Sequence, residues 1–161
     1  MGMPKLKVVQ KPQDGVTRGV MSSVEGLVPG LAGKIEIVVA EEHTAPHVGS
    51  GQVHVLATPV LVNLLEAAAL EAAERFVPAG HQTVGTRLDV QHFAATPVAM
   101  HVTAHAEVIE VKGRVITFKL WAEDEVEPIG SGTHERVIIN LERFDVRMQD
   151  KIKNRVPSVK R

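Results

Sequence analysis

Apolar and polar side chains alternate along most of the second half of the chain. A period of two is typical of strands that bury one face. An earlier segment alternates in the same way, and Lys112-Gly113 forms a turn signal between two of the later segments. The pattern therefore predicts five strands, over residues 34–40, 82–93, 98–111, 114–123 and 130–141.

One long apolar segment, 58–76, separates the first predicted strand from the other four. Thr58 is a suitable N-cap for a helix, and Pro59 would occupy the first helical position, where a missing N–H costs nothing. Pro78 and Gly80 mark the end of the segment. A strand, a long helix and four antiparallel strands predict an α+β fold in which a curved antiparallel sheet wraps around one central helix.

The composition restricts the classes of function. The chain has 161 residues, enough for one domain with a substantial core. Its 18 Lys and Arg against 19 Asp and Glu leave a formal charge of −1, and only 3% of its residues are aromatic, so we expect no nucleic-acid partner. The absence of cysteine excludes disulfide frameworks, thiolate metal sites and cysteine nucleophiles.

The two ends of the chain differ from the middle in composition. Residues 1–24 are polar and interrupted by Pro and Gly, which predicts a flexible arm before a folded domain over 25–150. The basic segment 151–161 is expected to be a solvated tail or an arm that touches a ligand phosphate or a partner subunit. The N-terminus lacks the apolar core of a secretory signal, and the longest apolar segment carries two glutamates, so we expect no membrane span and a cytoplasmic location.

Glu66 is the unusual residue of the predicted helix. On a helical wheel it lies within the apolar stripe, near Val62, Ala69 and Leu70, whereas Glu71 lies on the opposite side. A carboxylate that points toward a core needs a partner or a function. Glu66 is therefore a candidate for acid–base or nucleophilic chemistry, although capping of a loop N–H or a structural ion pair would also explain it.

His92 is the corresponding candidate among the strands. Strand parity places it on the apolar face of segment 82–93, together with Val84 and Leu88. An inward histidine is most often a satisfied core residue, but here an inward glutamate accompanies it. Thr58 adds a hydroxyl at the helix N-terminus, where free backbone N–H groups favour developing negative charge. Parity also suggests that Glu135 faces inward, as an ion-pair partner or a site residue, and that Arg136 faces the other way.

Three segments resemble the hotdog-fold thioesterases of the fluoroacetyl-CoA thioesterase group. They are VLATPVLVNLLEAAALEAA, VGTRLDVQHFAATP and IGSGTHERVIINLERFDV, and the resemblance extends over about residues 26 to 150. It implies a hotdog fold, binding of acyl-CoA near a dimer interface, and a catalytic set of Thr58, Glu66 and His92. It also implies that Gly85 lies beside the acyl group.

The resemblance implies a definite chemistry. The thioester carbonyl would lie at the helix N-terminus, polarised by backbone N–H groups and the Thr58 hydroxyl. Glu66 would act as a nucleophile or as a general base toward water, and His92 would activate water or protonate the leaving thiolate. Whether a covalent glutamyl anhydride forms stays open. No cofactor is expected beyond the CoA that belongs to the substrate.

One departure from the family concerns the lid before the catalytic threonine. The fluoroacetate-selective enzyme has phenylalanines there, whereas residues 47–52 of this chain (HVGSGQ) contain no aromatic side chain. We therefore expect a more open lid and a general short- or medium-chain acyl-CoA as substrate. Candidate substrate-binding residues are Gly49 and Gln52 in the lid, Gly85, and Arg136, which could reach a CoA phosphate or a neighbouring subunit.

Other functions receive less support from the sequence. A non-catalytic acyl-CoA-binding protein is the main alternative, and it would not need an inward carboxylate. A hotdog hydratase would need an Asp followed five residues later by a His, and only Glu42 and His47 have that spacing. No metal site is expected, since the histidines at 43, 47, 54, 101 and 105 have no evident third ligand.

The predicted architecture also bears on oligomeric state. A single curved sheet leaves one face and one edge uncovered, so a homodimer is expected, with pairing of dimers into tetramers left open.

Overall fold

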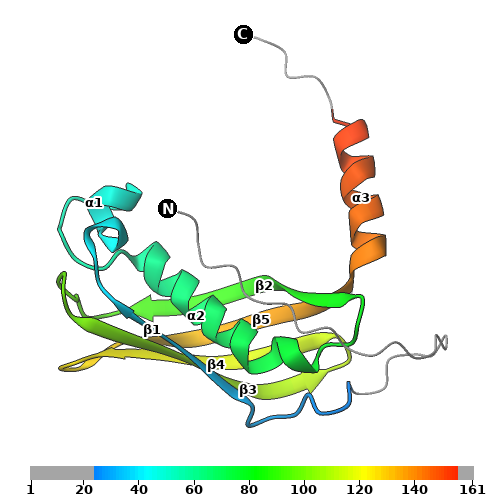
Figure 1. Cartoon of the computed structure of the whole chain (residues 1–161), viewed down its shortest axis with the longest axis horizontal. Helices are drawn as coiled ribbons and strands as arrows, with labels where there is room; N and C mark the ends of the chain where they lie inside the picture. Colours follow the sequence, from blue (N-terminus) through cyan, green and yellow to red (C-terminus); the bar gives the residue numbers. More distant parts are fainter. Residues whose placement is uncertain (1–23, 156–161) are drawn as a thin grey trace.

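The computed structural model describes residues 24–155, and their main feature is one antiparallel sheet curled around a helix (Figure 1). The helix is α2, Thr58–Ala73, and it continues as a 3-10 turn, η2, at Glu74–Phe76. Before it lie two short helices, η1 (Glu41–His43) and α1 (Ala45–Val48). The strands are β1 (Ala32–Val38), β2 (His81–His92), β3 (His101–Lys112), β4 (Val115–Asp124) and β5 (Pro128–Asn140).

The sheet has the order β1-β3-β4-β5-β2, and every neighbouring pair is antiparallel. This is the α+β hotdog arrangement predicted from the sequence, with all five strands found within a few residues of their expected positions. β2 lies at one edge of the sheet, next to β5. That position matters below because β2 carries His92 and Gly85.

The core lies between α2 and the concave face of the sheet. The buried face of α2 carries leucines in its first half and alanines in its second half, and the small side chains let the second half approach the sheet closely. Gly33 of β1 lies against the helix backbone, since a Cβ there would collide with the Ala68 carbonyl oxygen and lie 2.6 Å from the backbone nitrogen of Ala72. Glycine is therefore required where β1 crosses the helix.

Two local predictions about strand faces are wrong, and a β-bulge explains one of them. The register of β2 against β5 shifts between Gly85 and Arg87, so Thr86 is an extra residue and Val84 lies on the opposite face from Leu88 and His92. On β5 the expected parity is inverted: Glu135 is partly exposed, whereas Arg136 is only 8% exposed. Val137 and Ile139, which share the parity of Glu135, are apolar, whereas the inward face carries His134 and Arg136, and this misled the pattern.

The start of α2 also differs by one residue from the prediction. Ala57 is the N-cap, and Thr58 is the first residue of the helix, so Pro59 takes the second position. No side chain caps the helix, and the Thr58 hydroxyl is engaged elsewhere. It is therefore available to the site rather than to the helix end.

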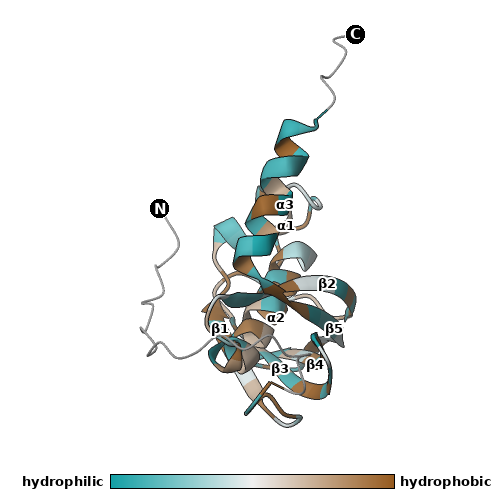
Figure 2. Ribbon diagram, turned by 90° about the vertical axis from the view of Figure 1, so that its right-hand side faces the viewer, coloured by the Kyte–Doolittle hydropathy of each residue, from teal (hydrophilic) through white to brown (hydrophobic). Residues whose placement is uncertain are grey.

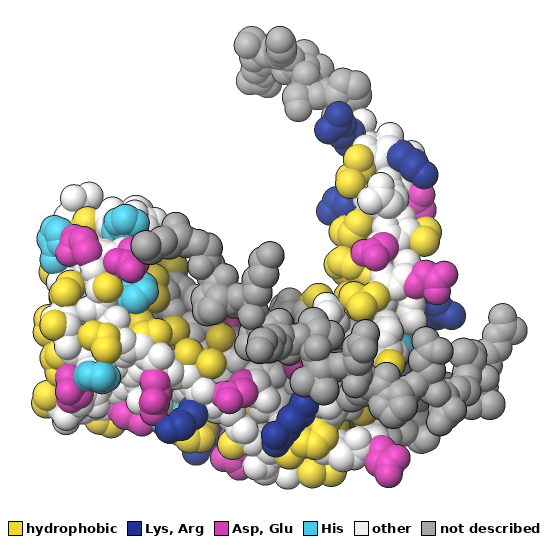
Figure 3. All heavy atoms as spheres, viewed as in Figure 1, with side chains coloured by type: hydrophobic (Ala, Val, Ile, Leu, Met, Phe, Trp, Pro, Cys, Tyr) yellow, Lys and Arg dark blue, Asp and Glu magenta, His cyan; other side chains and the backbone are white. Residues whose placement is uncertain are grey.

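A final helix, α3 (Leu141–Lys153), was not predicted. It begins directly after β5, where the Asn140 side chain accepts a hydrogen bond from the Arg143 backbone. None of its residues is buried; it projects from the end of the sheet, and polar and apolar residues mix along it (Figures 1 and 2). Hydrophobic side chains gather along the side turned toward the rest of the molecule (Figure 3). The helix extends into the predicted basic tail.

The predicted arm, 1–24, lies outside the described residues except for Val24, which is buried in the core. The described part of the chain contains no helix long and apolar enough to cross a membrane.

Candidate active site

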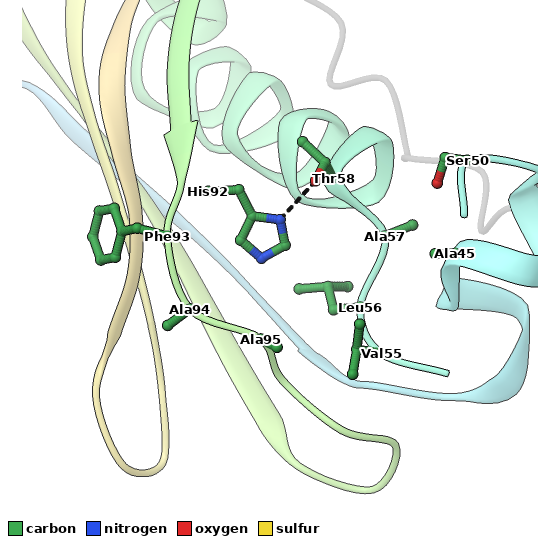
Figure 4. A pocket seen from close by; sticks show the side chains of 10 residues that line it. All are labelled: Ala45, Ser50, Val55, Leu56, Ala57, Thr58, His92, Phe93, Ala94 and Ala95. Carbon is green, nitrogen blue, oxygen red and sulfur yellow. Dashed lines mark hydrogen bonds between the residues drawn. The ribbon is translucent and has the colours of Figure 1, made fainter. Parts of the chain in front are cut away.

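Thr58 and His92 meet at the N-terminal end of α2. The Thr58 hydroxyl oxygen and Nδ1 of His92 lie 2.8 Å apart, at hydrogen-bonding distance (Figure 4). Thr58 is placed by the first turn of the helix, and His92 by the last residue of β2, where it pairs with Gly130 of β5. Gly130 leaves room for this approach, since a Cβ there would lie 2.9 Å from Leu61 of the helix.

The other ring nitrogen of His92 is unsatisfied. Nε2 is buried and has no hydrogen-bond partner in the structure. Burial lowers the pKa of His92 below its ordinary value, because the charged ring loses hydration, and an interaction with the backbone of Ala94 opposes this only in part. His92 is therefore a neutral imidazole near pH 7, with one buried ring nitrogen that lacks a hydrogen-bond partner.

A cavity of about 320 Å³ opens beside this pair. Its walls come from the end of β2 and the following loop, from the segment leading into α2, and from the α1 region, and Figure 4 shows His92 and Thr58 on one side with Ser50 across from them. Its lining is mainly alanine and aliphatic, with Phe93 as its largest ring. Of the predicted lid residues, Gly49 and Gln52 are exposed and do not line this cavity.

Glu66 lies on the side of α2 that faces β2, at the edge of the buried stripe rather than in its centre. Its side chain is 36% exposed. It packs against Gly85, where a Cβ would lie 2.7 Å from Oε1 of Glu66. The absence of a side chain at position 85 therefore makes room for the carboxylate.

Two basic side chains from β5, His134 and Arg136, lie close to the same carboxylate. Nε2 of His134 lies 3.7 Å and Nη1 of Arg136 lies 3.9 Å from Oε1 of Glu66. Both are buried. A second cavity of about 420 Å³ is lined by Glu66, Gly85 and Arg136 together with other residues of α2 and β2.

Glu66 is separated from Thr58 and His92 within one chain. Eight helical residues correspond to about 12 Å along the axis, and the two cavities share no lining residue. The structure thus brings together Thr58 with His92, and Glu66 with Gly85 and Arg136, but it does not bring the two groups together in one chain.

His134 is the site residue that sequence reasoning missed. The inverted parity of β5 hid it, although it belongs to the segment IGSGTHERVIINLERFDV, which carries part of the family resemblance. The signal was available in the even-numbered positions of β5, where Gly130, Gly132 and Ile138 mark the face that meets the helix and β2.

The remaining histidines do not form a site in the described residues. His105 contacts Glu123 at 2.6 Å and stacks on Trp121, and His54 contacts Glu41 at 3.0 Å. Residues 24–155 contain no group of three or more side chains that could hold a metal ion.

Comparison with known proteins decides the family. Residues 39–142 match the family described as FlK, fluoroacetyl-CoA-specific thioesterase. The chain belongs to this family. It is 41% identical over 97 residues to the fluoroacetyl-CoA thioesterase of Streptantibioticus cattleyicolor, an alignment that covers 60% of this chain and 70% of the relative. Membership makes the protein a hotdog-fold thioesterase, that is, a thioester hydrolase.

Solved structures agree with the FlK family assignment. A structure of FlK superposes with a TM-score of 0.74 at 34% identity, covering 79% of this chain and 98% of FlK. A thioesterase superfamily member from Thermus thermophilus has a TM-score of 0.74 at 24% identity, over 81% of this chain and 99% of its own, and supports the fold alone.

Proposed function

We propose that the protein hydrolyses acyl-CoA thioesters of short or medium chain length to the free acid and CoA, with Thr58, His92 and Glu66 as the reacting groups. The observation that carries this proposal is the Thr58–His92 pair, whose buried Nε2 has no partner and lies beside a cavity at the N-terminus of α2. The thioesterase relatives, of which FlK is described with fluoroacetyl-CoA, support the substrate class.

The geometry suggests how the chain would perform the reaction. The thioester carbonyl lies over the first turn of α2, where the Thr58 backbone N–H stabilises the oxyanion of the tetrahedral intermediate, because Pro59 has no N–H and those of Val60 and Leu61 donate to the Ala57 carbonyl. Through Nε2, His92 removes a proton from water or gives a proton to the leaving thiolate. Its Nδ1 is held by the Thr58 hydroxyl. Glu66 removes a proton from a water that attacks the carbonyl, or it attacks the carbonyl itself and forms a glutamyl anhydride that water hydrolyses in a second step. The C–S bond breaks, and the CoA thiolate takes up a proton as it leaves.

We further propose that the protein is a homodimer and that the second copy supplies the missing group. Glu66 is too far along α2 to act with the His92 of its own chain. β2 is one of the two edge strands and carries both His92 and Gly85, the neighbour of Glu66. Antiparallel pairing of two β2 strands about a two-fold axis would exchange their ends, so that Glu66 of one copy approaches His92 of the other.

We expect the protein to accept a range of acyl groups rather than to select fluoroacetyl. The segment that covers the cavity contributes Ala45, Ser50 and Val55, and no aromatic ring from 47–52 closes it. Such a lining discriminates acyl chains by size more than by polarity. Cytoplasmic location stays a prediction from the sequence.

Release of free thiol from a panel of acyl-CoAs tests the substrate class. The panel should contain acetyl-, fluoroacetyl-, butyryl-, hexanoyl- and decanoyl-CoA, and thiol reagents read out cleanly because the protein has no cysteine. We expect turnover of several members without a strong preference for fluoroacetyl-CoA. Binding without thiol release would instead indicate the non-catalytic alternative, and a large preference for fluoroacetyl-CoA would contradict the predicted specificity.

Variants test the residues. Glu66→Gln and His92→Asn should each abolish most of the turnover, while the control Glu110→Gln, which alters an exposed carboxylate in the β3–β4 hairpin, should not. Mixing Glu66→Gln subunits with His92→Asn subunits tests the shared site. If each site combines two chains, re-equilibrated mixtures regain about a quarter of the wild-type activity; no recovery after confirmed subunit exchange would place each site within one chain.

A further inference from the structure

Helix α3 carries an apolar stripe that stays unburied among the described residues. Its members recur at intervals of three or four residues, which places them on one side of a helix: Leu141, Phe144, Met148 and Ile152. None of them is buried, and Ile152 is 56% exposed. An isolated helix of 13 residues is marginal in water without tertiary packing. α3 therefore needs a surface on which this stripe can pack.

The direction of α3 indicates where that surface lies. The helix starts beside β2, because the Leu141 backbone N–H donates to the Gly80 carbonyl just before that strand. It then rises past β2, away from the other strands, in both ribbon views (Figures 1 and 2). Its 13 residues extend about 20 Å, the width of about four strands of a sheet. α3 therefore borders the space that a second copy would occupy if it paired with the β2 edge.

Antiparallel pairing of two β2 strands determines which part of the second copy α3 meets. That pairing exchanges the strand ends, so the start of one β2, where α3 begins, lies beside the end of the other. β2 ends at His92, next to the cavity that is also lined by Ala45, Ser50 and Val55. We call residues 41–55 the α1 segment. Within one chain α1 and α3 lie at opposite ends of the molecule (Figure 1), so α3 can meet an α1 segment only in the second copy.

The α1 segment complements α3 in both apolar surface and charge. Two of its valines, Val48 and Val53, are 41% and 68% exposed. It carries two exposed glutamates, at positions 41 and 42, and no Lys or Arg. Residues 141–155 contain five Lys and Arg against three acidic residues. Three of these basic residues recur at intervals of four along one flank of the stripe: Arg143, Arg147 and Lys151.

We propose that the apolar stripe of α3 docks on the α1 segment of the second copy, with its basic flank beside Glu41 and Glu42. Each copy thereby holds in place the segment that lines the other copy's cavity and that has no Phe, Trp or Tyr of its own. The inference rests on the homodimer of the proposed function, but on none of the residues assigned to the reaction. Contacts and association, rather than turnover, therefore test it.

Cross-linking of introduced cysteines tests the contact directly, because the protein has no cysteine of its own. Val48→Cys chains are mixed with Met148→Cys chains, subunits are allowed to exchange, and a short bifunctional maleimide is added. We expect a covalent dimer from the mixture but not from either variant alone. Ile109→Cys, an exposed position of β3, replaces Val48→Cys in the control and should give no covalent dimer. A covalent dimer from Met148→Cys alone would show that two α3 helices pair with each other, and the inference would be wrong.

The dissociation constant of the dimer, measured by sedimentation, tests the two surfaces. Met148→Glu places a charge in the stripe, and we expect it to weaken the dimer at least about 10-fold, because an unpaired charge is costly to bury. Val146→Glu is the matched control, since Val146 is 57% exposed and lies away from the stripe. Arg147→Glu should also weaken the dimer, and adding Glu42→Lys should restore part of the affinity. Equal dissociation constants for Met148→Glu and Val146→Glu would overturn the inference.

A single cysteine in β2 distinguishes failure of this inference from failure of the proposed dimer. Arg87→Cys lies near the middle of the strand and should cross-link to its own copy across a two-fold pair. If it does, and the mixture of Val48→Cys with Met148→Cys does not, the inference fails while the dimer stands. A wild-type protein that sediments as a monomer would contradict the proposed dimer, and the inference would fall with it.

Discussion

The Thr58 hydroxyl lies 2.8 Å from Nδ1 of His92, and the opposite nitrogen of that ring is buried without a partner. One hydrogen bond therefore fixes the ring, and it leaves a single unsatisfied nitrogen beside the cavity. A core histidine retained only for packing would be expected to satisfy both nitrogens. The pair has the geometry of a base oriented by a hydroxyl.

Removing the Thr58 hydroxyl should slow turnover more than it changes binding. Thr58→Val keeps the shape but releases Nδ1 of His92, and we expect kcat to fall by about 10- to 1,000-fold, the range of a lost orienting or oxyanion contact. Thr58→Ser should retain most of the activity because the oxygen is kept. Steady-state kinetics with both variants check this, and equal activity of the two would show that the hydroxyl does not participate.

The two buried histidines predict how stability depends on pH. Burial lowers the pKa of both His92 and His134, so between their folded values and the ordinary value near 6.5 the unfolded chain binds more protons than the folded one. Their contribution to stability is complete above about pH 6.5 and is lost as the pH falls through the folded values. Urea unfolding between pH 7.5 and 5 should therefore show decreasing stability.

A variant isolates this effect from other titrating groups. His134→Gln removes one of the two protonation events, so its stability should fall less steeply over the same pH interval than that of the wild type. Parallel curves for the two proteins would show that His134 is not responsible.

Gly85→Ala should impair the reaction without unfolding the protein. The added Cβ would lie 2.7 Å from Oε1 of Glu66 and 3.0 Å from Cε1 of His134, and the partly exposed Glu66 side chain is the one that can move. We expect at least about a 10-fold loss of kcat from the displaced carboxylate. Gln82→Ala, an exposed position on the same strand, is the control, and wild-type kinetics of Gly85→Ala would contradict the placement of Glu66.

Gly33→Ala should destabilise the fold instead. Its Cβ would contact backbone atoms of α2 at Ala68 and Ala72, which cannot move as a side chain end can. We expect a loss of about 1–3 kcal/mol in the free energy of unfolding, as for other overpacked positions. Gly51→Ala, whose added Cβ would come no nearer than 3.3 Å to another group, provides the comparison in urea titrations. An unchanged midpoint for Gly33→Ala would mean that β1 shifts away from the helix without cost.

The sequence by itself determined the five strands, the central helix and the candidates Thr58, Glu66 and His92, because alternation and helix periodicity are local properties that burial imposes on one face. It did not determine which face of β5 is inward, because both faces of that strand mix polar and apolar residues and a bulge at Thr86 changes the parity of its neighbour β2. It also gave no sign that α3 follows β5 directly.

Only the tertiary structure decided which candidates act together. Contacts across the sheet joined His134, Arg136 and Thr83 around Glu66, and they depend on the register of β2 against β5 rather than on spacing along the chain. The same register and the rise of α2 separate Glu66 from His92 within one chain. Distances between residues far apart in sequence follow from how strands pair, and that pairing is not encoded in any one segment.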